Sequence, residues 1–307
     1  MNERASRLLR RHGWKLGAVV GSGMEGTVVD LSSDEVAKIW HGRSREDLHA
    51  LATFGLALEE ASLPFETPQV LELLEDDGLV VTIERKVRGQ PLASRPDPTP
   101  PQADARTMDL LGDVLEGLSQ IGVSPGLAAL PILPGDRPFD WRRPFPESLA
   151  DLVERRFQRS PDLLRRVVGD VDHLVAGVAA GLRALPQSRP SALLHGDLIP
   201  ANVLVQNGRV TGVLDFGFLT SVGDSHFDAA ITASIFDMFG PNARLSENLL
   251  SQAFVDRFGH DPDRYGLYRA AYAVITHGYF GSDGADGHFS WCAQMLRRSD
   301  VTASVLS

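Results

Sequence analysis

Three polar residues between positions 197 and 215 have the types and spacing that phosphoryl transfer requires. Asp197 follows a His-Gly pair, Asn202 follows it in the same segment, and Asp215 opens an Asp-Phe-Gly triplet. An Asp in the first place can accept the proton of an acceptor hydroxyl, and the Asn and second Asp offer hard oxygen ligands for Mg²⁺. The ordered set predicts a kinase-type catalytic loop followed by a metal-binding motif.

The segment between Asn202 and Asp215 is expected to be a hairpin that brings both ligands to one end. Its apolar runs at 203–206 and 209–214 flank the pair Asn207-Gly208. That pair favours a type I′ turn because both positions accept positive φ. Either Asp alone has an ordinary explanation, since Asp commonly caps turns and ends strands. The ordered set favours the chemical interpretation.

A glycine-rich loop near the N-terminus supplies the second half of the pattern. The loop residues expected to bind nucleotide phosphates are Gly21, Ser22, Gly23, Gly26 and Val28. G-x-G-x-x-G also occurs in dinucleotide-binding folds, where the glycines open a helix. Here β-branched residues follow at 27–31, and a second apolar run follows at 35–40, so the loop joins two strands. Lys38 in the second run is the expected partner of the α/β-phosphates.

With both halves in view, the chain resembles the aminoglycoside phosphotransferase family, the small-molecule branch of the protein-kinase-like fold. The resemblance is strongest over residues 193–230, where HGDLIPANV, VLDFG and GDSHFDAAI look like the family's H-G-D-x-x-x-x-N, I-D-[FW] and G-D-x-x-x-D-L-A. The glycine loop departs from the family and looks closer to the protein-kinase form.

The resemblance implies a set of roles. Asp197 would place the acceptor hydroxyl, Lys38 would meet the phosphates, and Asn202 and Asp215 would hold one or two Mg²⁺ ions. ATP, with GTP as the alternative, would be held between two lobes. His195, grouped with the catalytic residues, would support the catalytic loop by hydrogen bonding rather than transfer protons.

Several further positions follow from the same resemblance. Glu46, in the first turn of a helix predicted at 45–60, is the preferred ion-pair partner of Lys38, although no Glu occupies the middle of that helix. Backbone groups of Glu84 and Lys86 would pair with the adenine edge. Asp228 is expected to tie its segment to the catalytic loop rather than touch the substrate.

The acceptor is expected to be a small hydroxylated molecule. Ile199 stands where protein serine/threonine kinases usually carry a Lys, and no A-P-E follows Gly217. An aminoglycoside or related amino-sugar is the leading acceptor; the alternative is a metabolic kinase of the sugar, choline or homoserine type. A protein kinase or a non-catalytic nucleotide-binding module is less favoured. Candidate acceptor contacts are Asp237, Asp256, Asp261, Asp263, Asp283, Asp286, Tyr272, Tyr279 and Trp291.

The composition fits this interpretation. At 307 residues with 43% hydrophobic content, the chain can bury a substantial core. The single cysteine excludes an internal disulfide. No apolar run suits a signal peptide or a bilayer span, so we expect a cytoplasmic location without membrane contact. The formal charge of −10 disfavours nucleic acid and favours a cationic acceptor. A monomer or a homodimer is expected.

The pattern of elements predicts an α+β, protein-kinase-like fold with two lobes. A small antiparallel-sheet N-lobe with one main helix would span residues 1–88, and a larger, mostly helical C-lobe would span 89–307. Strands are predicted at 14–20, 27–31, 35–40, 69–74 and 79–87, and helices at 45–60, 103–121 and 161–185. The Pro-rich stretch 91–101 is expected to be a loop.

Overall fold

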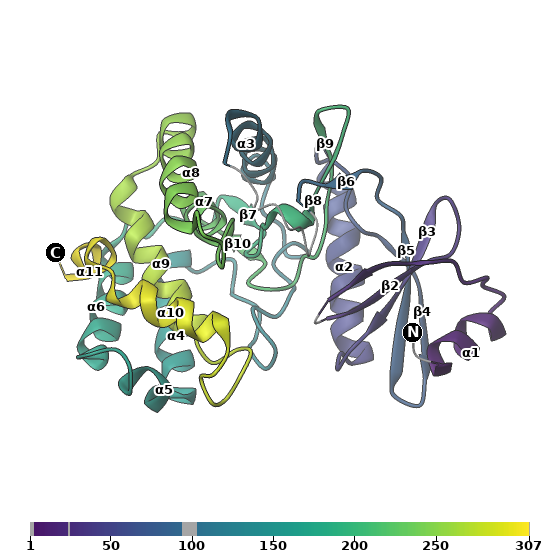
Figure 1. Cartoon of the computed structure of the whole chain (residues 1–307), viewed down its shortest axis with the longest axis horizontal. Helices are drawn as coiled ribbons and strands as arrows, with labels where there is room; N and C mark the ends of the chain where they lie inside the picture. Colours follow the sequence, from purple (N-terminus) through teal and green to yellow (C-terminus); the bar gives the residue numbers. More distant parts are fainter. Residues whose placement is uncertain (1–2, 24, 94–102, 307) are drawn as a thin grey trace. The chain divides into compact units, whose positions relative to one another are not determined.

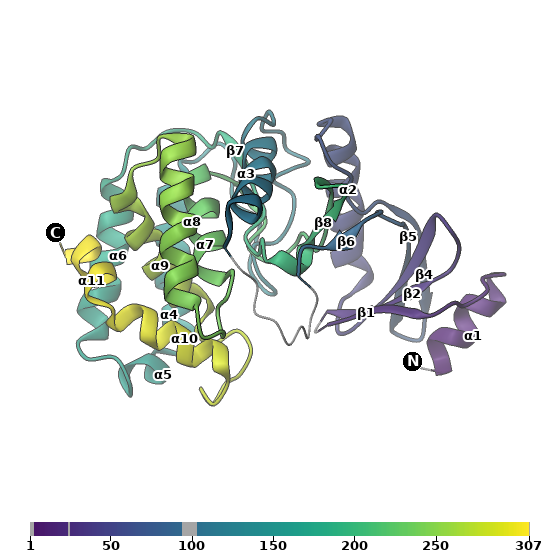
Figure 2. The same ribbon diagram turned by 45° about the horizontal axis from the view of Figure 1, so that its top comes forward.

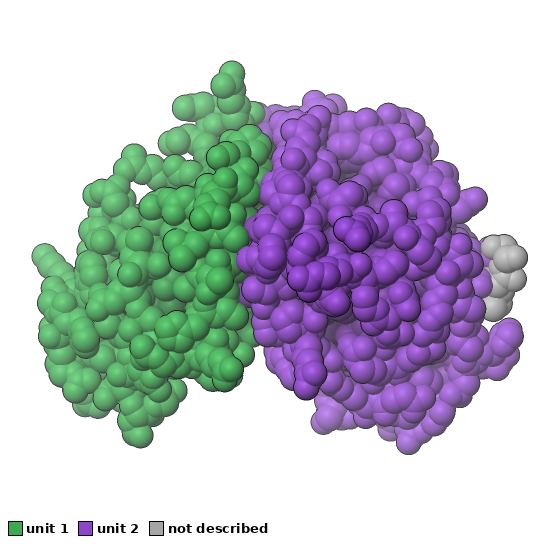
Figure 3. Space-filling view, turned by 180° about the vertical axis from the view of Figure 1, so that it is seen from behind, with its two compact units in different colours: residues 1–91, 203–215 green, residues 92–202, 216–307 purple. Residues whose placement is uncertain are grey.

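The structure is a computed structural model that describes residues 3–23, 25–93 and 103–306. It contains two compact units (Figure 3): residues 1–91 with 203–215, and residues 92–202 with 216–307. The first boundary therefore lies after Pro91 rather than after residue 88, and the predicted hairpin belongs to the first unit. Most of the Pro-rich stretch predicted as a loop, residues 94–101, lies outside the described residues.

The first unit contains a five-stranded antiparallel sheet in the order β1-β2-β3-β5-β4. Figure 1 labels β2, β3, β4 and β5 of this sheet. The strands are β1 (Val19–Ser22), β2 (Gly26–Asp30), β3 (Glu35–Trp40), β4 (Val70–Asp76) and β5 (Leu79–Arg85). Asp77 and Gly78 join β4 to β5 with φ of 49° and 77°, as a tight hairpin turn requires. The five predicted strands are confirmed, but the first begins at Val19 rather than at residue 14.

Helix α2 (Arg45–Glu60) has the predicted bounds. Ser44 starts it with a capping box, because its side chain accepts a hydrogen bond from the Asp47 N–H while the Asp47 carboxylate accepts one from the Ser44 N–H. The apolar face of the helix, including Leu48, packs on Trp40 and Val80 of the sheet. This packing fixes the helix next to β3.

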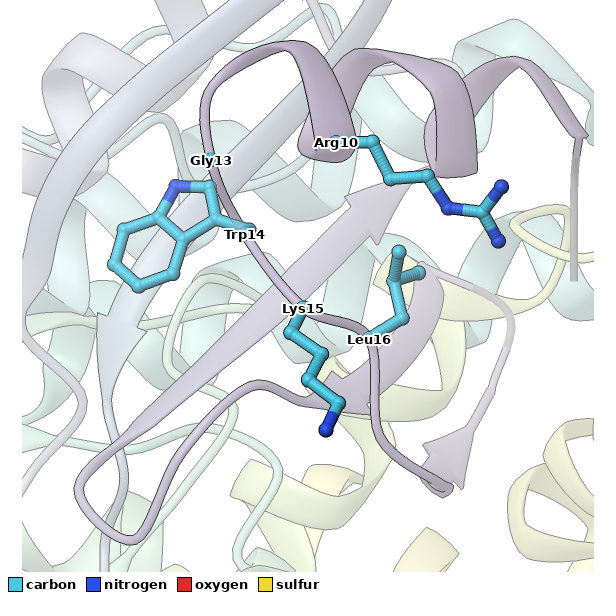
Figure 4. A pocket seen from close by; sticks show the side chains of 5 residues that line it. All are labelled: Arg10, Gly13, Trp14, Lys15 and Leu16. Atoms are coloured by element: carbon cyan, nitrogen blue, oxygen red, sulfur yellow. The ribbon is translucent and has the colours of Figure 1, made fainter.

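A second helix in the first unit was not predicted. In α1 (Glu3–Arg11), Ala5, Leu8 and Leu9 lie at i, i+3 and i+4 and are buried against the sheet. A hollow of about 320 Å³ lies beside it, lined by Arg10, Gly13, Trp14, Lys15 and Leu16 (Figure 4). No predicted site residue lines this hollow.

A small antiparallel sheet, β6-β8-β9, completes the first unit. Its strands are β6 (Gln90–Pro91), β8 (Val203–Gln206) and β9 (Arg209–Val213). Asn207 and Gly208 have φ of 52° and 79°, which confirms the type I′ turn. The Glu66 N–H donates to the Thr211 carbonyl, and the Val213 N–H donates to the Glu66 carbonyl. These bonds are the physical reason that the hairpin joins the first unit.

The second unit is mostly helical (Figure 2). Its helices are α3 (Ala105–Ser119), α4 (Phe145–Arg159), α5 (Pro161–Arg165), α6 (Val171–Ala184), α7 (Ser225–Ile235), α8 (Ala243–Phe258), α9 (Pro262–Thr276), α10 (Gly287–Arg297) and α11 (Ser299–Leu306). The almost wholly buried α9 packs against α4, α6, α7, α10 and α11. Among the described helices, none combines the length and apolar character needed to cross a bilayer.

Two short strands of the second unit, β7 (Ala192–Leu194) and β10 (Ser221–Gly223), pair antiparallel. The helix predicted over 161–185 is interrupted, so that this prediction is wrong in its middle. Asp170 has a φ of 50°, which an α-helix cannot contain, and it stands immediately before the start of α6.

Candidate active site

Lys38 is the centre of the first half of the site, which lies wholly in the first unit. It stands in the middle of β3, opposite Val28 of β2 and Thr82 of β5. Its Nζ atom lies 2.8 Å from Oδ1 of Asp215, which is 177 positions away in the sequence. The same Nζ lies 3.8 Å from Oε2 of Glu25 in the glycine loop. The fold thus joins the predicted phosphate-binding lysine to the predicted metal ligand.

The surroundings of Lys38 keep it charged. Burial alone would lower the pKa of Lys38, but Asp215, Glu84 and Glu25 together raise it above its usual value. The Nζ atom also lies 4.0 Å from the centroid of the Trp40 ring, a cation–π contact. A permanently charged ammonium suits a group that must bind phosphate oxygens.

Asp215 follows β9 in a backbone conformation that is rare for a residue with a side chain. Its φ is 58°, and its side chain remains 54% exposed although Lys38 contacts it. Non-glycine residues with positive φ are uncommon and occur often at functional sites. Gly217 and Leu219 also have positive φ, at 138° and 56°. The Asp-Phe-Gly motif is therefore a sharp turn that leaves a carboxylate accessible.

The glycines of the loop differ in how much space surrounds them. A Cβ on Gly26 would collide with the carbonyl oxygen of Ile39 on the neighbouring strand, so packing excludes a side chain there. A Cβ on Gly23 would meet no atom within 4 Å, and Ser22 is exposed. The Gly23 N–H donates to the Gly26 carbonyl and closes the loop. Gly23 and Ser22 are therefore the exposed part of the loop.

The second half of the site is the catalytic loop of the second unit. The Asp228 carboxylate accepts hydrogen bonds from the N–H groups of His195, at 2.8 Å, and Gly196, at 2.9 Å. The Thr220 hydroxyl donates to the His195 carbonyl at 2.8 Å. Asp228 is 2% exposed, and burial raises its pKa. The expectation that Asp228 ties its segment to the catalytic loop is confirmed.

His195 is fully buried and supports the loop. Its Nδ1 accepts a hydrogen bond from the Asp197 N–H at 3.2 Å, and its ring centroid lies 4.6 Å from that of Phe216. A Cβ on Gly196, whose φ is 82°, would collide with the carbonyl oxygen of Phe218. These contacts fix the backbone that carries Asp197. They correspond to a positioning role for His195.

Asn202 and Asp215 provide the ligand types that Mg²⁺ prefers. The Asn202 side-chain N–H donates to the Asp197 carbonyl at 2.9 Å, which orients the amide and leaves its oxygen as an acceptor. Amide and carboxylate oxygens suit Mg²⁺, which usually completes its shell with water and substrate phosphates. Within the described part of the chain, no group of three or more His, Cys, Asp and Glu side chains could hold a metal. Each of the two side chains is of a type that could bind Mg²⁺ together with phosphate oxygens.

Comparison with known proteins is consistent with this geometry. A family model described as "Phosphotransferase enzyme family" matches residues 17–268, a stretch that contains both halves of the site. The chain belongs to this family. It is 31% identical over 170 residues to an aminoglycoside 3′-phosphotransferase of Streptomyces fradiae, covering 51% of this chain and 53% of that protein. A homoserine kinase of Methylocella silvestris is 34% identical over 79 residues, covering 23% and 24%. The chain thus spans about half the length of the first relative and less of the second.

Solved structures of phosphotransferases share the fold. The macrolide 2′-phosphotransferase of Brachybacterium faecium gives a TM-score of 0.61 at 19% identity, covering 96% of this chain and 98% of that one. The GDP complex of wild-type aminoglycoside 2′-phosphotransferase-IIIa gives 0.65 at 18% identity, covering 98% of both chains. These likenesses confirm the predicted α+β, kinase-like fold.

The predicted ion pair between Lys38 and Glu46 is not observed. Glu46 is exposed and has no ion pair among the described residues. It precedes the buried Leu48 by two residues, which turns it roughly 200° away around the helix. The face of α2 toward the sheet is apolar. The carboxylates that contact Lys38 are those of Asp215 and Glu25.

The predicted adenine contacts involve backbone groups, and the contact at Glu84 stays a prediction. Glu84 lies inside the sheet, opposite Val36 on one side and Val70 on the other. Its carboxylate accepts a hydrogen bond from Thr82, and burial, opposed by the attraction of Lys38, raises its pKa.

The backbone N–H of Lys86 is engaged, because it donates a hydrogen bond to the Asp34 carbonyl at 2.8 Å. The Nζ atom of Lys86 lies 2.7 Å from Oδ1 of Asp30. Val87 is the next residue along the chain. Within the described residues its N–H has no hydrogen-bond partner. The open backbone donor therefore lies one residue beyond Lys86.

An aromatic cluster in the second unit includes three of the candidate acceptor contacts. Burial, and then the charge of Asp197, raise the pKa of Tyr272. The ring centroid of Phe218 lies 4.7 Å from that of Tyr279 and 6.3 Å from that of Phe280. Trp291 meets Tyr272 edge to face at 5.8 Å. Sequence reasoning missed Phe218 and Phe280, although Phe218 directly follows the Asp-Phe-Gly motif.

The candidate carboxylates of the acceptor region divide by structural role. Asp261 and Asp286 cap the N-termini of α9 and α10. Asp256 accepts a hydrogen bond from the Gln252 side chain one helical turn earlier. Asp237 is 7% exposed, and burial raises its pKa. Asp283 remains exposed.

Proposed function

We propose that this protein transfers the γ-phosphoryl group of a nucleoside triphosphate to a hydroxyl of a small molecule. The observation that carries the proposal is the 2.8 Å pair between Lys38 and Asp215. It joins the strand after the glycine loop to the Asp-Phe-Gly motif across 177 positions of sequence. A lysine on a strand that contacts the aspartate of an Asp-Phe-Gly motif is typical of the half of a kinase site that binds the phosphates and the metal.

Each residue has a defined task in the proposed reaction. Lys38 binds phosphate oxygens, Asp215 and Asn202 supply metal ligands, and Asp197 orients the acceptor hydroxyl. A bound Mg²⁺ would neutralise charge on the β- and γ-phosphates. The hydroxyl oxygen forms a bond to the γ-phosphorus as the bond from that phosphorus to the β-bridging oxygen breaks. The hydroxyl proton passes to Asp197, and the nucleoside diphosphate leaves with the electron pair of the broken bond.

For the donor we propose ATP, with GTP as the alternative. Two structures that share the fold are complexes with GDP and with ADP, respectively. We propose that the Val87 N–H, rather than that of Lys86, binds the base, because the Lys86 N–H is already engaged. Backbone groups would contact the hydrogen-bonding edge of the base. The pattern of donors and acceptors on that edge differs between adenine and guanine.

For the acceptor we propose an aminoglycoside or related amino-sugar. The 31% identity to an aminoglycoside 3′-phosphotransferase supports this class. So do a gentamicin complex and a streptomycin complex of proteins that share the fold. An aromatic cluster and acidic side chains in the second unit suit a cationic ring compound. A metabolic acceptor of the sugar, choline or homoserine type is the second candidate, supported by the short match to a homoserine kinase.

The test is nucleoside diphosphate release from Mg-ATP and Mg-GTP against a panel of possible acceptors. The panel contains aminoglycosides, macrolides, amino sugars, free sugars, choline and homoserine, with the Asp197→Asn variant as the blank. We expect release stimulated by one acceptor class and absent from the blank. If the wild-type chain bound neither nucleotide, the proposed phosphoryl transfer would be wrong. Stimulated release that persisted in the blank would contradict the role of Asp197.

A further inference from the structure

We infer that Glu25 in the glycine loop is the positioning residue that holds Lys38 when Asp215 turns to the metal. The inference rests on the proposed function and deepens it. Glu25 was not among the predicted site residues. Its role would couple the glycine loop to the lysine through one carboxylate.

In the structure Lys38 holds two carboxylates at different distances. Oδ1 of Asp215 is 2.8 Å from Nζ, and Oε2 of Glu25 is 3.8 Å from the same atom. Lys38 is only 11% exposed, so that its charge requires a nearby anion. A metal bound to Asp215 would draw that carboxylate away from Lys38. Glu25 is then the nearest remaining carboxylate that contacts Nζ.

The main helix cannot supply this anion. The face of α2 that packs on the sheet presents Leu48 and Leu51 to Trp40 and Val80. Glu46, near its start, is turned to solvent. Glu84 is buried near Lys38, but its carboxylate accepts a hydrogen bond from Thr82. Glu25 is the remaining acid whose carboxylate contacts Nζ of Lys38.

Two further contacts keep Glu25 in place. Its Oε1 lies 2.6 Å from a guanidinium nitrogen of Arg43, and its backbone carbonyl accepts a hydrogen bond from the His41 N–H at 2.8 Å. Arg43 therefore holds one carboxylate oxygen while the other faces Lys38. A charge-assisted bond of this length orients the carboxylate group. The order Arg43, Glu25, Lys38 forms a short chain of alternating charge within the first unit.

Loss of Glu25 should weaken the coupling between Mg²⁺ binding and ATP binding. Without Glu25, Lys38 would keep Asp215 as its only contacting carboxylate and would compete more strongly with Mg²⁺ for it. Removing an acid near the phosphates would by itself favour free ATP. Both effects reduce the tightening that Mg²⁺ gives to ATP binding, whereas damage to the sheet would weaken every ligand.

The experiment measures dissociation constants of full-length variants by titration calorimetry. The probes are ATP with Mg²⁺, ATP with EDTA, and adenosine, which has no phosphate. The main variant is Glu25→Gln, and Glu46→Gln is the matched control with the same change in charge. We expect Mg²⁺ to lower the dissociation constant of ATP by some factor in the wild type. In Glu25→Gln we expect that factor to be about fivefold to tenfold smaller. Adenosine affinity should be unchanged, and Glu46→Gln should match the wild type.

Arg43→Gln gives a second route if Glu25→Gln does not fold. It leaves the acid in place but removes its holder, and should lose a smaller part of the Mg²⁺ tightening. The inference would be wrong, with the proposed function untouched, if Mg²⁺ increased the ATP affinity of Glu25→Gln as much as that of the wild type. An equal loss of adenosine affinity in Glu25→Gln would have the same consequence. If wild-type protein bound no ATP or GTP, or bound them without Mg²⁺ tightening, the proposed function would fail and the inference with it.

Discussion

The two halves of the site are held by different forces. In the first unit, Lys38 and Asp215 meet through an ion pair whose carboxylate is 54% exposed. In the second unit, Asp228 is 2% exposed and binds two backbone N–H groups of the catalytic loop. An ion pair whose carboxylate is open to solvent can exchange partners. A buried carboxylate that binds backbone groups is costly to disturb.

This difference matches what each half must do. In the proposed reaction, the Lys38 half receives charged phosphates and a metal, so that its ion pairs would open when the ligands bind. The catalytic loop has to hold Asp197 in one geometry, and rigid backbone hydrogen bonds serve that purpose. Substitutions should therefore separate into those that change ligand binding and those that change the catalytic step or the fold.

The largest effect is expected at Asp197. Asp197→Asn removes the proton acceptor but keeps the shape of the side chain, so transfer should fall by about 10³-fold or more. Mg-ATP affinity should stay within about threefold of wild type, since the first unit is unchanged. Steady-state turnover and calorimetry measure the two quantities, with Asp109→Asn, an exposed residue of α3, as the control. Near-normal turnover would exclude Asp197 as the base.

A second, smaller effect is expected at Asp215. Asp215→Asn weakens a metal ligand and removes the 2.8 Å partner of Lys38. Mg-ATP binding should weaken by about tenfold to a hundredfold, as expected for loss of an ionic ligand. ATP binding in EDTA should change little or improve. The matched comparison is Asp30→Asn, which removes a carboxylate paired with Lys86 on the same sheet. An equal loss in EDTA would contradict a metal role for Asp215.

The catalytic loop should respond in stability. In Asp228→Asn, the amide NH₂ would face one of the two backbone donors, from His195 or Gly196, and leave it unsatisfied. We expect a loss of about 2–3 kcal/mol in the free energy of unfolding, together with reduced turnover. Urea unfolding measures the first, with the exposed Asp256→Asn as control. A midpoint equal to that of the control would show that the two backbone bonds contribute little.

Much of the site was predictable because sequence spacing determines it. Lys38 and Asp215 lie in motifs whose positions follow from a strand after a glycine loop and from a hairpin that ends in Asp-Phe-Gly. The type I′ turn at Asn207-Gly208 followed from the two residue types alone. Helix α2 had a clear start at Ser44. Each of these features is encoded locally.

The missed features depend on side-chain direction or on a shift of one residue. Glu25 meets Lys38 only because of how their side chains point, and sequence alone does not give that direction. The open donor at Val87 rather than Lys86 depends on one position of strand register. Helix α1 carries only three buried apolar side chains, Ala5, Leu8 and Leu9, too few for a strong periodic signal.

The Val87 assignment predicts a moderate effect on nucleotide binding. Val87→Pro removes the backbone N–H proposed to bind the base, whereas Val87→Ala keeps it. We expect Val87→Pro to weaken adenosine binding by about tenfold and Val87→Ala to have little effect. Equal thermal unfolding midpoints for the two variants are the control for folding. Equal adenosine affinities in two folded variants would rule out the Val87 N–H as the base-binding donor.

The smallest expected effect is a loss of stability at acidic pH that arises from a histidine in the second unit. In the second unit, burial, together with repulsion from His226, lowers the pKa of His260 to about 4 from its usual 6.5. The unfolded chain therefore takes up a proton as the pH falls through about 6.5, while the folded chain takes it up only near 4. Stability should decrease progressively between those values. Lys38 in the first unit, whose pKa is raised, stays charged throughout this range.

Thermal unfolding at pH 7.5 and pH 5 measures this difference. We expect a midpoint lower by several degrees at pH 5. The drop should shrink in His260→Gln, which lacks the titrating ring but retains hydrogen-bonding groups for Tyr265 and Ser225. The exposed His173→Gln should leave the drop unchanged. Because buried His288 also has a pKa lowered to about 4, a residual drop should persist in His260→Gln and disappear only when both are replaced.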